Sequence, residues 1–261
     1  MKKIIIHLGF PKTGTTSIQA MLEVNKDLFG SDVFISAKDN FTRKIRKSQL
    51  SVIRNDTKFN KIRRFFAIKR FIKNIKNISS NLIVISDENL IGIDSYSIFN
   101  KININNIKYF INKLDVELDK FDIKYILYIR NIDKWQLSCF NQCVKAGSFN
   151  KDFEQWKINM ISTDNPFQII KTLKSILQDR LLVVKMEEEL SSDLFLGKGI
   201  LDSCGFEKEI LDKILIEPSK NKSLPMAALN FISIIRSKNK KYLHINQIIK
   251  YIQDNTNLFY K

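Results

Sequence analysis

Short runs of apolar, largely β-branched residues recur along the chain. They lie at residues 4–8, 82–85, 125–129 and 181–184, with a weaker candidate at 33–35. Their length and composition are typical of buried parallel strands. The stretches between them, such as 15–25, 107–118 and 135–145, repeat apolar residues at three- and four-residue steps, which predicts helices. Strands that alternate with helices predict an α/β fold, with a central, mainly parallel sheet flanked by helices.

No repeat, linker or composition shift marks a domain boundary in the 261 residues. We therefore predict a single domain over residues 1–261, with a helical insert at about 40–78 and a helical C-terminal part at about 205–261. No apolar run reaches the roughly 18 residues that a membrane-spanning helix needs. The N-terminal run resembles a secretion signal only faintly, because His7 interrupts it, so we expect a buried first strand and a cytoplasmic protein. The three cysteines have no neighbouring residues that could complete a metal site, so no bound metal is expected.

The positive charge is concentrated in the insert. The whole chain has 43 Lys and Arg against 27 Asp and Glu, a net charge of +16. Residues 43–76 hold thirteen Lys and Arg and one acid, Asp56, so this segment contributes 13 − 1 = +12. Apolar residues at helical spacing run through it from Phe59 to Ile75. Two interpretations stay open: a surface for an anionic partner, which is an acidic glycan, a nucleic acid or a membrane, or the solvated basic face of a helix packed on the sheet.

The stretch after the first strand has the spacing of a phosphate-binding loop. Gly9 and Gly14 match the two glycines of G-x-x-x-x-G-K-[ST], and Thr16 stands at the Ser/Thr position. The lysine position holds Thr15, whereas a lysine lies inside the loop at Lys12. Backbone N–H groups and the helix dipole still suit a phosphate, but the lysine that reaches a triphosphate is missing. The sequence therefore predicts a loop for a single 5′-phosphate, with a cation beside the group being transferred.

This loop, x-Gly-x-Pro-Lys-x-Gly-Thr-Thr-Ser after a strand, resembles the 5′-phosphosulfate loop of sulfotransferases that use 3′-phosphoadenosine 5′-phosphosulfate (PAPS). The bacterial and carbohydrate-modifying branch is favoured, because the Arg-Lys-Gly signature of the cytosolic small-molecule enzymes is absent. The resemblance implies a P-loop-like three-layer fold, PAPS as the donor and no required metal. It also implies that the donor is bound by the residues of the loop: Pro11, Lys12, Thr13, Gly14, Thr15, Thr16 and Ser17.

A second pair is expected to bind the 3′-phosphate of the donor. Arg130 ends a predicted strand and Ser138 follows eight residues later in a predicted helix, as in the family that the loop resembles. An arginine at a strand end can direct its planar guanidinium onto a phosphate. The alternative for Arg130 is a structural ion pair.

Three residues are candidates for catalytic roles: Lys12, Glu88 and His7. The resemblance favours Glu88, which follows the strand at 82–85, as the base that deprotonates the acceptor, and Lys12 as the stabiliser of the leaving phosphate. Glu88 could instead cap a helix or orient a lysine, and Asp87 is the competing carboxylate. His7 could act as a base near neutral pH, but its place within an apolar strand favours a hydrogen-bonded core role.

The expected activity is transfer of a sulfuryl group to an acceptor hydroxyl or amine, on a bacterial glycan or glycolipid, with a small molecule as the other possible acceptor. Two other functions stay open: a P-loop nucleotide kinase or phosphotransferase, and a non-enzymatic binder of anionic polymers through the basic insert. The sequence has no pattern of a nucleic-acid-binding module, so nucleic acid is not an expected partner. We expect a cytoplasmic location, with peripheral contact at the inner membrane face through the insert as a further possibility.

Overall fold

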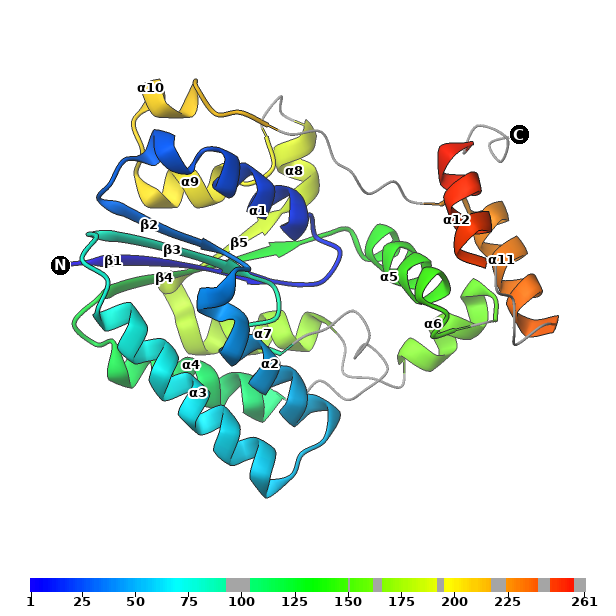
Figure 1. The fold of residues 1–261 in the computed structure, drawn as a ribbon, viewed down its shortest axis with the longest axis horizontal. Coiled ribbons are helices and arrows are strands. Elements are labelled where there is room, and N and C mark those ends of the chain that lie inside the picture. Colours follow the sequence, from blue (N-terminus) through cyan, green and yellow to red (C-terminus); the bar gives the residue numbers. More distant parts are fainter. Residues whose placement is uncertain are drawn as a thin grey trace. The chain divides into compact units, whose positions relative to one another are not determined.

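The computed structural model describes residues 1–92, 104–149, 151–161, 166–191, 195–216, 224–238 and 245–255 (Figure 1). The chain groups into two compact units. The first comprises Met1–Arg130 and Asp164–Pro218, and the second comprises Asn131–Thr163 and Ser219–Lys261. The single domain over 1–261 stays a prediction.

The first unit contains a five-stranded parallel sheet. Its strands are β1 (Lys3–Gly9), β2 (Val33–Ala37), β3 (Leu82–Asp87), β4 (Asp122–Ile129) and β5 (Leu181–Lys185). They lie in the order β2-β3-β1-β4-β5, and every neighbouring pair is parallel. Because β1 lies between β3 and β4, the chain crosses from one side of β1 to the other after β3. Ligands of open α/β sheets bind at the carboxyl ends of the strands beside such a crossing.

Alternating side chains of β1 lie on opposite faces of the sheet. Ile4, Ile6 and Leu8 are buried in the core that helices α2 (Asn40–Arg54), α3 (Lys58–Lys76), α4 (Ile104–Glu117) and α7 (Pro166–Leu177) build on one face. Ile5 is buried in the core that α1 (Thr15–Val24) and α9 (Lys198–Cys204) build on the other. The predicted α/β fold, with a central parallel sheet flanked by helices, is confirmed.

The predicted elements agree closely with the observed ones in this unit. The strand expected most weakly, at 33–35, is the core of β2. The basic insert is helical, as expected, but it forms two helices, α2 and α3, which are joined through residues 55–57. The described part of the first unit is completed by short elements: η1 (Lys26–Phe29), η3 (Gln178–Arg180), α8 (Met186–Ser191) and α10 (Lys208–Leu211).

The second unit is helical in its described part. It contains α5 (Ile132–Ala146), α6 (Phe153–Ile161), α11 (Met226–Lys238) and α12 (Ile245–Asp254). The guanidinium of Arg236, on α11, donates hydrogen bonds to the carbonyls of Val144 and Lys145 at the end of α5. Phe140 of α5 packs against the stacked rings of Phe153 and Trp156. Helices α11 and α12 belong to the C-terminal part that the sequence predicts to be helical.

Candidate functional site

The loop between β1 and α1 has a constrained backbone. Lys12 has φ 68° and Gly14 has φ 80°, so both adopt the left-handed conformation. A side chain at Gly14 would also collide with a neighbour, because a Cβ there would lie 2.2 Å from Leu196 Cδ2. Inside the loop the buried Thr13 hydroxyl donates to the Phe10 carbonyl at 2.7 Å. The loop is therefore held in a tight turn that sets the direction of Lys12.

Gly14 is the N-cap of α1, and the helix begins without the usual capping. No side chain caps its first turn and no acidic residue lies there. The Gly14 carbonyl accepts from the N–H groups of Ser17 and Ile18, at 2.9 and 3.1 Å. A helix start with a positive dipole end and no acidic side chain of its own suits an anion. This is the feature that a bound 5′-phosphate requires of the loop.

Gly9 permits a close approach of the next strand. A Cβ at Gly9 would lie 2.5 Å from Glu88 Cβ, 2.7 Å from Glu88 Cα and 2.7 Å from Thr15 Cγ2. Strands β1 and β3 are neighbours in the sheet, with Leu8 opposite Asp87, so the residues that follow them come together. The absence of a side chain at Gly9 therefore brings Glu88 against the start of the phosphate loop.

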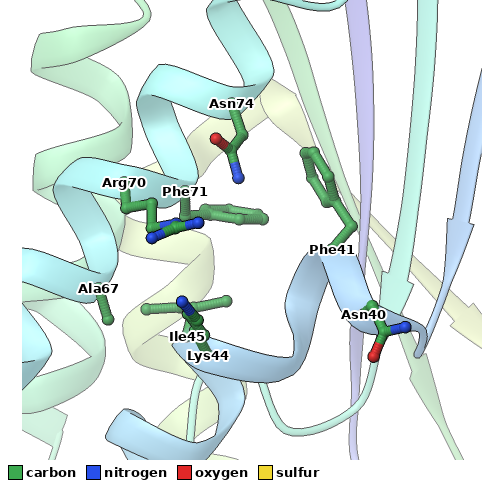
Figure 2. Close-up of a pocket in the computed structure, with 8 residues that line it drawn as sticks. All are labelled: Asn40, Phe41, Lys44, Ile45, Ala67, Arg70, Phe71 and Asn74. Carbon is green, nitrogen blue, oxygen red and sulfur yellow. The ribbon is translucent and has the colours of Figure 1, made fainter.

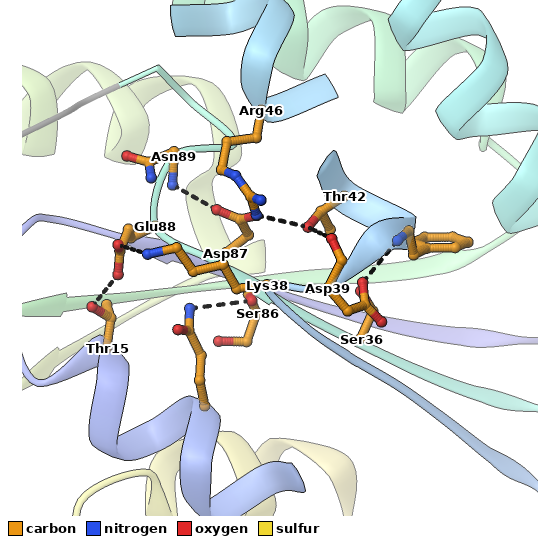
Figure 3. A network of polar contacts seen from close by, with 12 residues as sticks. Thr15, Ser36, Lys38, Asp39, Thr42, Arg46, Ser86, Asp87, Glu88 and Asn89 are labelled. Atoms are coloured by element: carbon orange, nitrogen blue, oxygen red, sulfur yellow. Dashed lines mark hydrogen bonds and ion pairs between the residues drawn. The ribbon is translucent and has the colours of Figure 1, made fainter. Parts of the chain in front are cut away.

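Glu88 is anchored at both carboxylate oxygens (Figure 3). The Thr15 hydroxyl donates to Oε2, and the Lys38 ammonium donates to Oε1. The Glu88 side chain is only 16% exposed. Burial alone would raise its pKa, but the hydrogen bonds from Lys38 and Thr15 and the charge of Lys38 outweigh burial and lower the pKa below its ordinary value. Glu88 is thus a carboxylate at neutral pH, adjacent to the loop.

Lys38 was not among the residues that the sequence indicates. It follows β2 directly, its φ is 58°, and its N–H donates to the Ser86 carbonyl at 3.0 Å. Parallel strands end at the same edge of the sheet, so a lysine just after β2 can reach a carboxylate just after β3. That signal is present in the sequence. It depends, however, on knowing that β2 and β3 are neighbours.

The competing carboxylate, Asp87, has a structural environment. It is fully buried. Its Oδ2 accepts from the Thr42 hydroxyl at 2.7 Å and from the guanidinium of Arg46, and its Oδ1 accepts from the Asn89 N–H at 3.0 Å (Figure 3). Asp87 therefore fixes helix α2 to the end of β3. Arg46 belongs to the basic insert, so part of that insert supports the site.

His7 lies inside the sheet. Its side chain is fully buried, Nδ1 is 2.8 Å from Ser86 Oγ, and its ring packs edge-on against Tyr128. Burial lowers the pKa of His7 to about 4, although the charge of Glu88 acts to raise it. The imidazole is therefore neutral near pH 7. This environment favours the hydrogen-bonded core role over the role of a solvent-accessible base.

Arg130 lies immediately after β4 and reaches the loop. Its NH1 donates to the Lys12 carbonyl at 3.4 Å, and its Nε is 3.9 Å from a Glu187 carboxylate oxygen. The Nε atom is buried and has no hydrogen-bond partner among the described residues. Such an atom is what a phosphate ligand would satisfy. Ser138 is buried on α5 in the second unit, and its pairing with Arg130 stays a prediction.

Two further features concern possible metal and membrane roles. Within the part of the chain that the structure describes, no three His, Cys, Asp or Glu side chains are grouped to hold a metal ion. Among the described helices, none combines the length and the hydropathy that crossing a bilayer requires. All three cysteines are buried thiols.

Taken together, the parallel sheet and the loop between β1 and α1 define an α/β protein of the P-loop-like class. No protein-family model and no curated protein matches the sequence. Among solved structures, the chain is similar to the sulfotransferase from Alicyclobacillus acidocaldarius. The identity is 12%, the match covers 95% of this chain and 99% of that one, and the TM-score is 0.47.

Proposed function

We propose that the chain is a sulfotransferase that moves a sulfuryl group from PAPS to an acceptor hydroxyl or amine. The observation that carries the proposal is the meeting of three features at one edge of the sheet. These are the loop with Lys12, the uncapped start of α1 and the ionised Glu88. The contact of Arg130 with the Lys12 carbonyl adds a second cation to the same edge. An anion site with a carboxylate directly beside it suits transfer of a sulfuryl group from a phosphosulfate anhydride, with the 5′-phosphate as the leaving group and an acceptor nucleophile that loses its proton to the carboxylate.

The loop residues would divide the binding of the donor between them. Backbone N–H groups and hydroxyls at the start of α1 would hold the 5′-phosphate, with Pro11 and Thr13 shaping the turn. The Thr15 hydroxyl already donates its hydrogen bond to Glu88, so in this proposal Thr16 and Ser17 supply the hydroxyls that bind the 5′-phosphate. Lys12 would stabilise the charge that develops on the leaving phosphate. PAPS supplies the sulfuryl group when it is bound.

Arg130 is proposed to select the donor by its 3′-phosphate. Its buried Nε lacks a hydrogen-bond partner among the described residues, and a phosphate oxygen would supply one. An adenosine nucleotide without a 3′-phosphate would leave this atom unsatisfied, which is costly at a buried site. Ser138 is proposed as the second donor to the 3′-phosphate.

Glu88 is proposed as the base that removes the proton from the hydroxyl or amine to which the sulfuryl group is transferred. Its lowered pKa keeps it ionised, and its oxygens are directed by Lys38 and Thr15. For His7 we propose a supporting role: as a buried neutral neighbour of Glu88, bonded to Ser86, it orders the end of β3. A positioned base contributes roughly 10²–10⁴ in rate. The proposed acceptor is a bacterial glycan or glycolipid, which the sequence resemblance favours, and the proposed location is cytoplasmic.

The donor can be tested by thermal unfolding with the product nucleotide, 3′-phosphoadenosine 5′-phosphate (PAP), against AMP and ATP with Mg²⁺. We expect PAP to raise the unfolding temperature and AMP to have a much smaller effect. Stabilisation by Mg²⁺–ATP without any response to PAP would instead support the phosphotransferase alternative.

The role of Lys12 can be tested by transfer from labelled PAPS. Lys12→Ala is expected to lose transfer while its unfolding temperature without nucleotide stays near that of the wild type. The matched control is Lys124→Ala, which removes an exposed lysine of β4. Wild-type activity in Lys12→Ala would refute the mechanism.

A further inference from the structure

Helix α3 exposes a row of large apolar side chains. Phe59, Ile62 and Phe66 are 68%, 55% and 63% exposed. Steps of three and four residues place them on one side of the helix. The apolar residues that α3 buries lie further along the helix: Ile68, Phe71, Ile72 and Ile75. The first half of α3 therefore presents apolar surface to the solvent, which is typical of an interaction site.

Basic residues surround this row. The segments of α2 and α3 contain thirteen Lys and Arg and no acid, and Asp56 lies in the connection between the helices. Several of the thirteen are engaged within the unit. Arg46 bonds Asp87, the buried Arg64 lies over the Tyr109 ring, and Lys61 and Lys76 pair with Asp56 and Glu117. Arg63, Lys69, Arg70 and Lys73 are exposed on the same side of α3 as the apolar row, with Arg63 and Lys69 over the rings of Phe59 and Phe65.

The cations of α2 and α3 also meet at a small cavity. It has a volume of about 80 Å³ and is lined by residues of both helices. Figure 2 shows Lys44 of α2 and Arg70 of α3 at this cavity with the amide of Asn74, while Phe41 and Phe71 supply apolar wall. A cavity with two cationic groups and an amide suits the phosphate of a lipid headgroup.

We propose that the α2–α3 hairpin docks on an anionic lipid bilayer. Phe59, Ile62 and Phe66 enter the boundary between headgroups and acyl chains, and the surrounding bases, Lys44 and Arg70 among them, contact the headgroup phosphates. Apolar side chains flanked by Lys and Arg on one helix are the signature of interfacial binding, and each base near an anionic surface adds to it. A soluble polyanion would match the charge but would leave the apolar row in water. The proposal is independent of the sulfotransferase activity.

Vesicle co-sedimentation of the full chain tests the docking. We expect binding to vesicles of phosphatidylcholine with roughly a third phosphatidylglycerol, little binding to phosphatidylcholine alone, and weakening as salt rises. Absence of binding to the anionic vesicles would overturn the proposal. So would equal binding to both kinds of vesicle.

The apolar row is tested by the triple variant Phe59→Ser, Ile62→Ser and Phe66→Ser. We expect its affinity for the anionic vesicles to fall by about tenfold or more, because apolar burial is lost while the charge is kept. The matched control removes exposed apolar side chains elsewhere, by Val24→Ser, Val116→Ser and Leu215→Ser, and should bind as the wild type does. If the two variants bind equally, the apolar row is not the docking surface.

The basic component is tested by Lys69→Gln, Arg70→Gln and Lys73→Gln. We expect a loss of about tenfold or more and a shallower salt dependence. The control removes the same number of exposed basic residues, by Lys120→Gln, Lys124→Gln and Lys208→Gln. Equal losses in both would show that total charge, not this hairpin, drives binding.

The thermal shift with PAP should be unchanged in every variant, which separates this test from that of the donor site. Binding to soluble dextran sulfate as strong as to vesicles, and equal in the Phe59–Phe66 variant, would overturn the bilayer in favour of a polyanion.

Discussion

The burial of His7 predicts that the protein loses stability in mild acid. In an unfolded chain the imidazole takes up a proton near its ordinary pKa of 6.5, whereas in the folded protein it does so only at about 4. Between these values the unfolded state binds more protons. The free energy of unfolding therefore falls as the pH falls through this window, and the stability is fully present above it.

The size of the loss follows from the two pKa values of His7. Each pKa unit corresponds to about 1.4 kcal/mol, so the whole window is worth about 3 kcal/mol. Most of the titration above about pH 5 is that of the unfolded chain, and lowering the pH from about 7 to about 5 should cost about 2 kcal/mol. That is a large fraction of the stability of an ordinary domain.

Urea unfolding followed by circular dichroism at both pH values measures the loss. The variant His7→Asn isolates the contribution of the histidine, since an amide can take the place of Nδ1 beside Ser86 but does not titrate. Carboxylates such as Glu88 also destabilise the fold in acid, and they are present in both proteins. The pH-dependent loss should therefore be about 2 kcal/mol smaller in His7→Asn. An equal loss in the two proteins would refute the buried, neutral imidazole.

Three other predictions concern the candidate site. Lys38→Asn keeps a residue that tolerates a left-handed backbone but removes the ammonium from Glu88. The pKa of Glu88 should then rise, which moves the acid limb of the pH–rate profile for transfer to higher pH, whereas Lys38→Arg should keep the limb near its original place. Gly9→Ala should cost about 1–3 kcal/mol in urea unfolding and reduce transfer, because the new methyl group meets Glu88 and Thr15; an unchanged unfolding midpoint would contradict the close approach. Arg130→Lys should weaken stabilisation by PAP more than by AMP in thermal unfolding, and equal weakening would remove the 3′-phosphate from its role.

The sheet could be predicted from the sequence because the central strands β1, β3 and β4 are largely buried on both faces. Each of them contains a run of apolar residues, and Gly9 and Pro11 mark where the first run ends. The order of the strands could not be predicted in this way. Pairing of β1 with β3 and β4 depends on contacts far apart in the chain, and no local pattern records them. The sequence therefore does not indicate Lys38, although it does indicate Glu88, the residue that Lys38 contacts.

The candidate site shows the same division between local and distant information. The loop from Gly9 to Ser17 is recognisable because its pattern lies in consecutive residues. The environments of Asp87 and Glu88, at the end of β3, are not recognisable in this way, since neighbouring carboxylates can face opposite sides of the sheet edge. Asp87 is turned into the protein toward Arg46, whereas Glu88 is turned toward Thr15 and Lys38.

The insert is more closely connected to the site than its sequence suggests. Charge alone makes residues 43–76 look like an appendage, with +12 of the chain's +16. In the structure, however, α2 begins two residues after Lys38, and its Arg46 and Thr42 hold Asp87, the residue before Glu88. Helix α2 thus anchors the end of β3 through one side and carries the exposed Lys44 and Lys47 on another. Binding of the α2–α3 hairpin to an anionic surface would therefore act on α2. This helix is hydrogen-bonded to Asp87, which directly precedes the proposed base, Glu88.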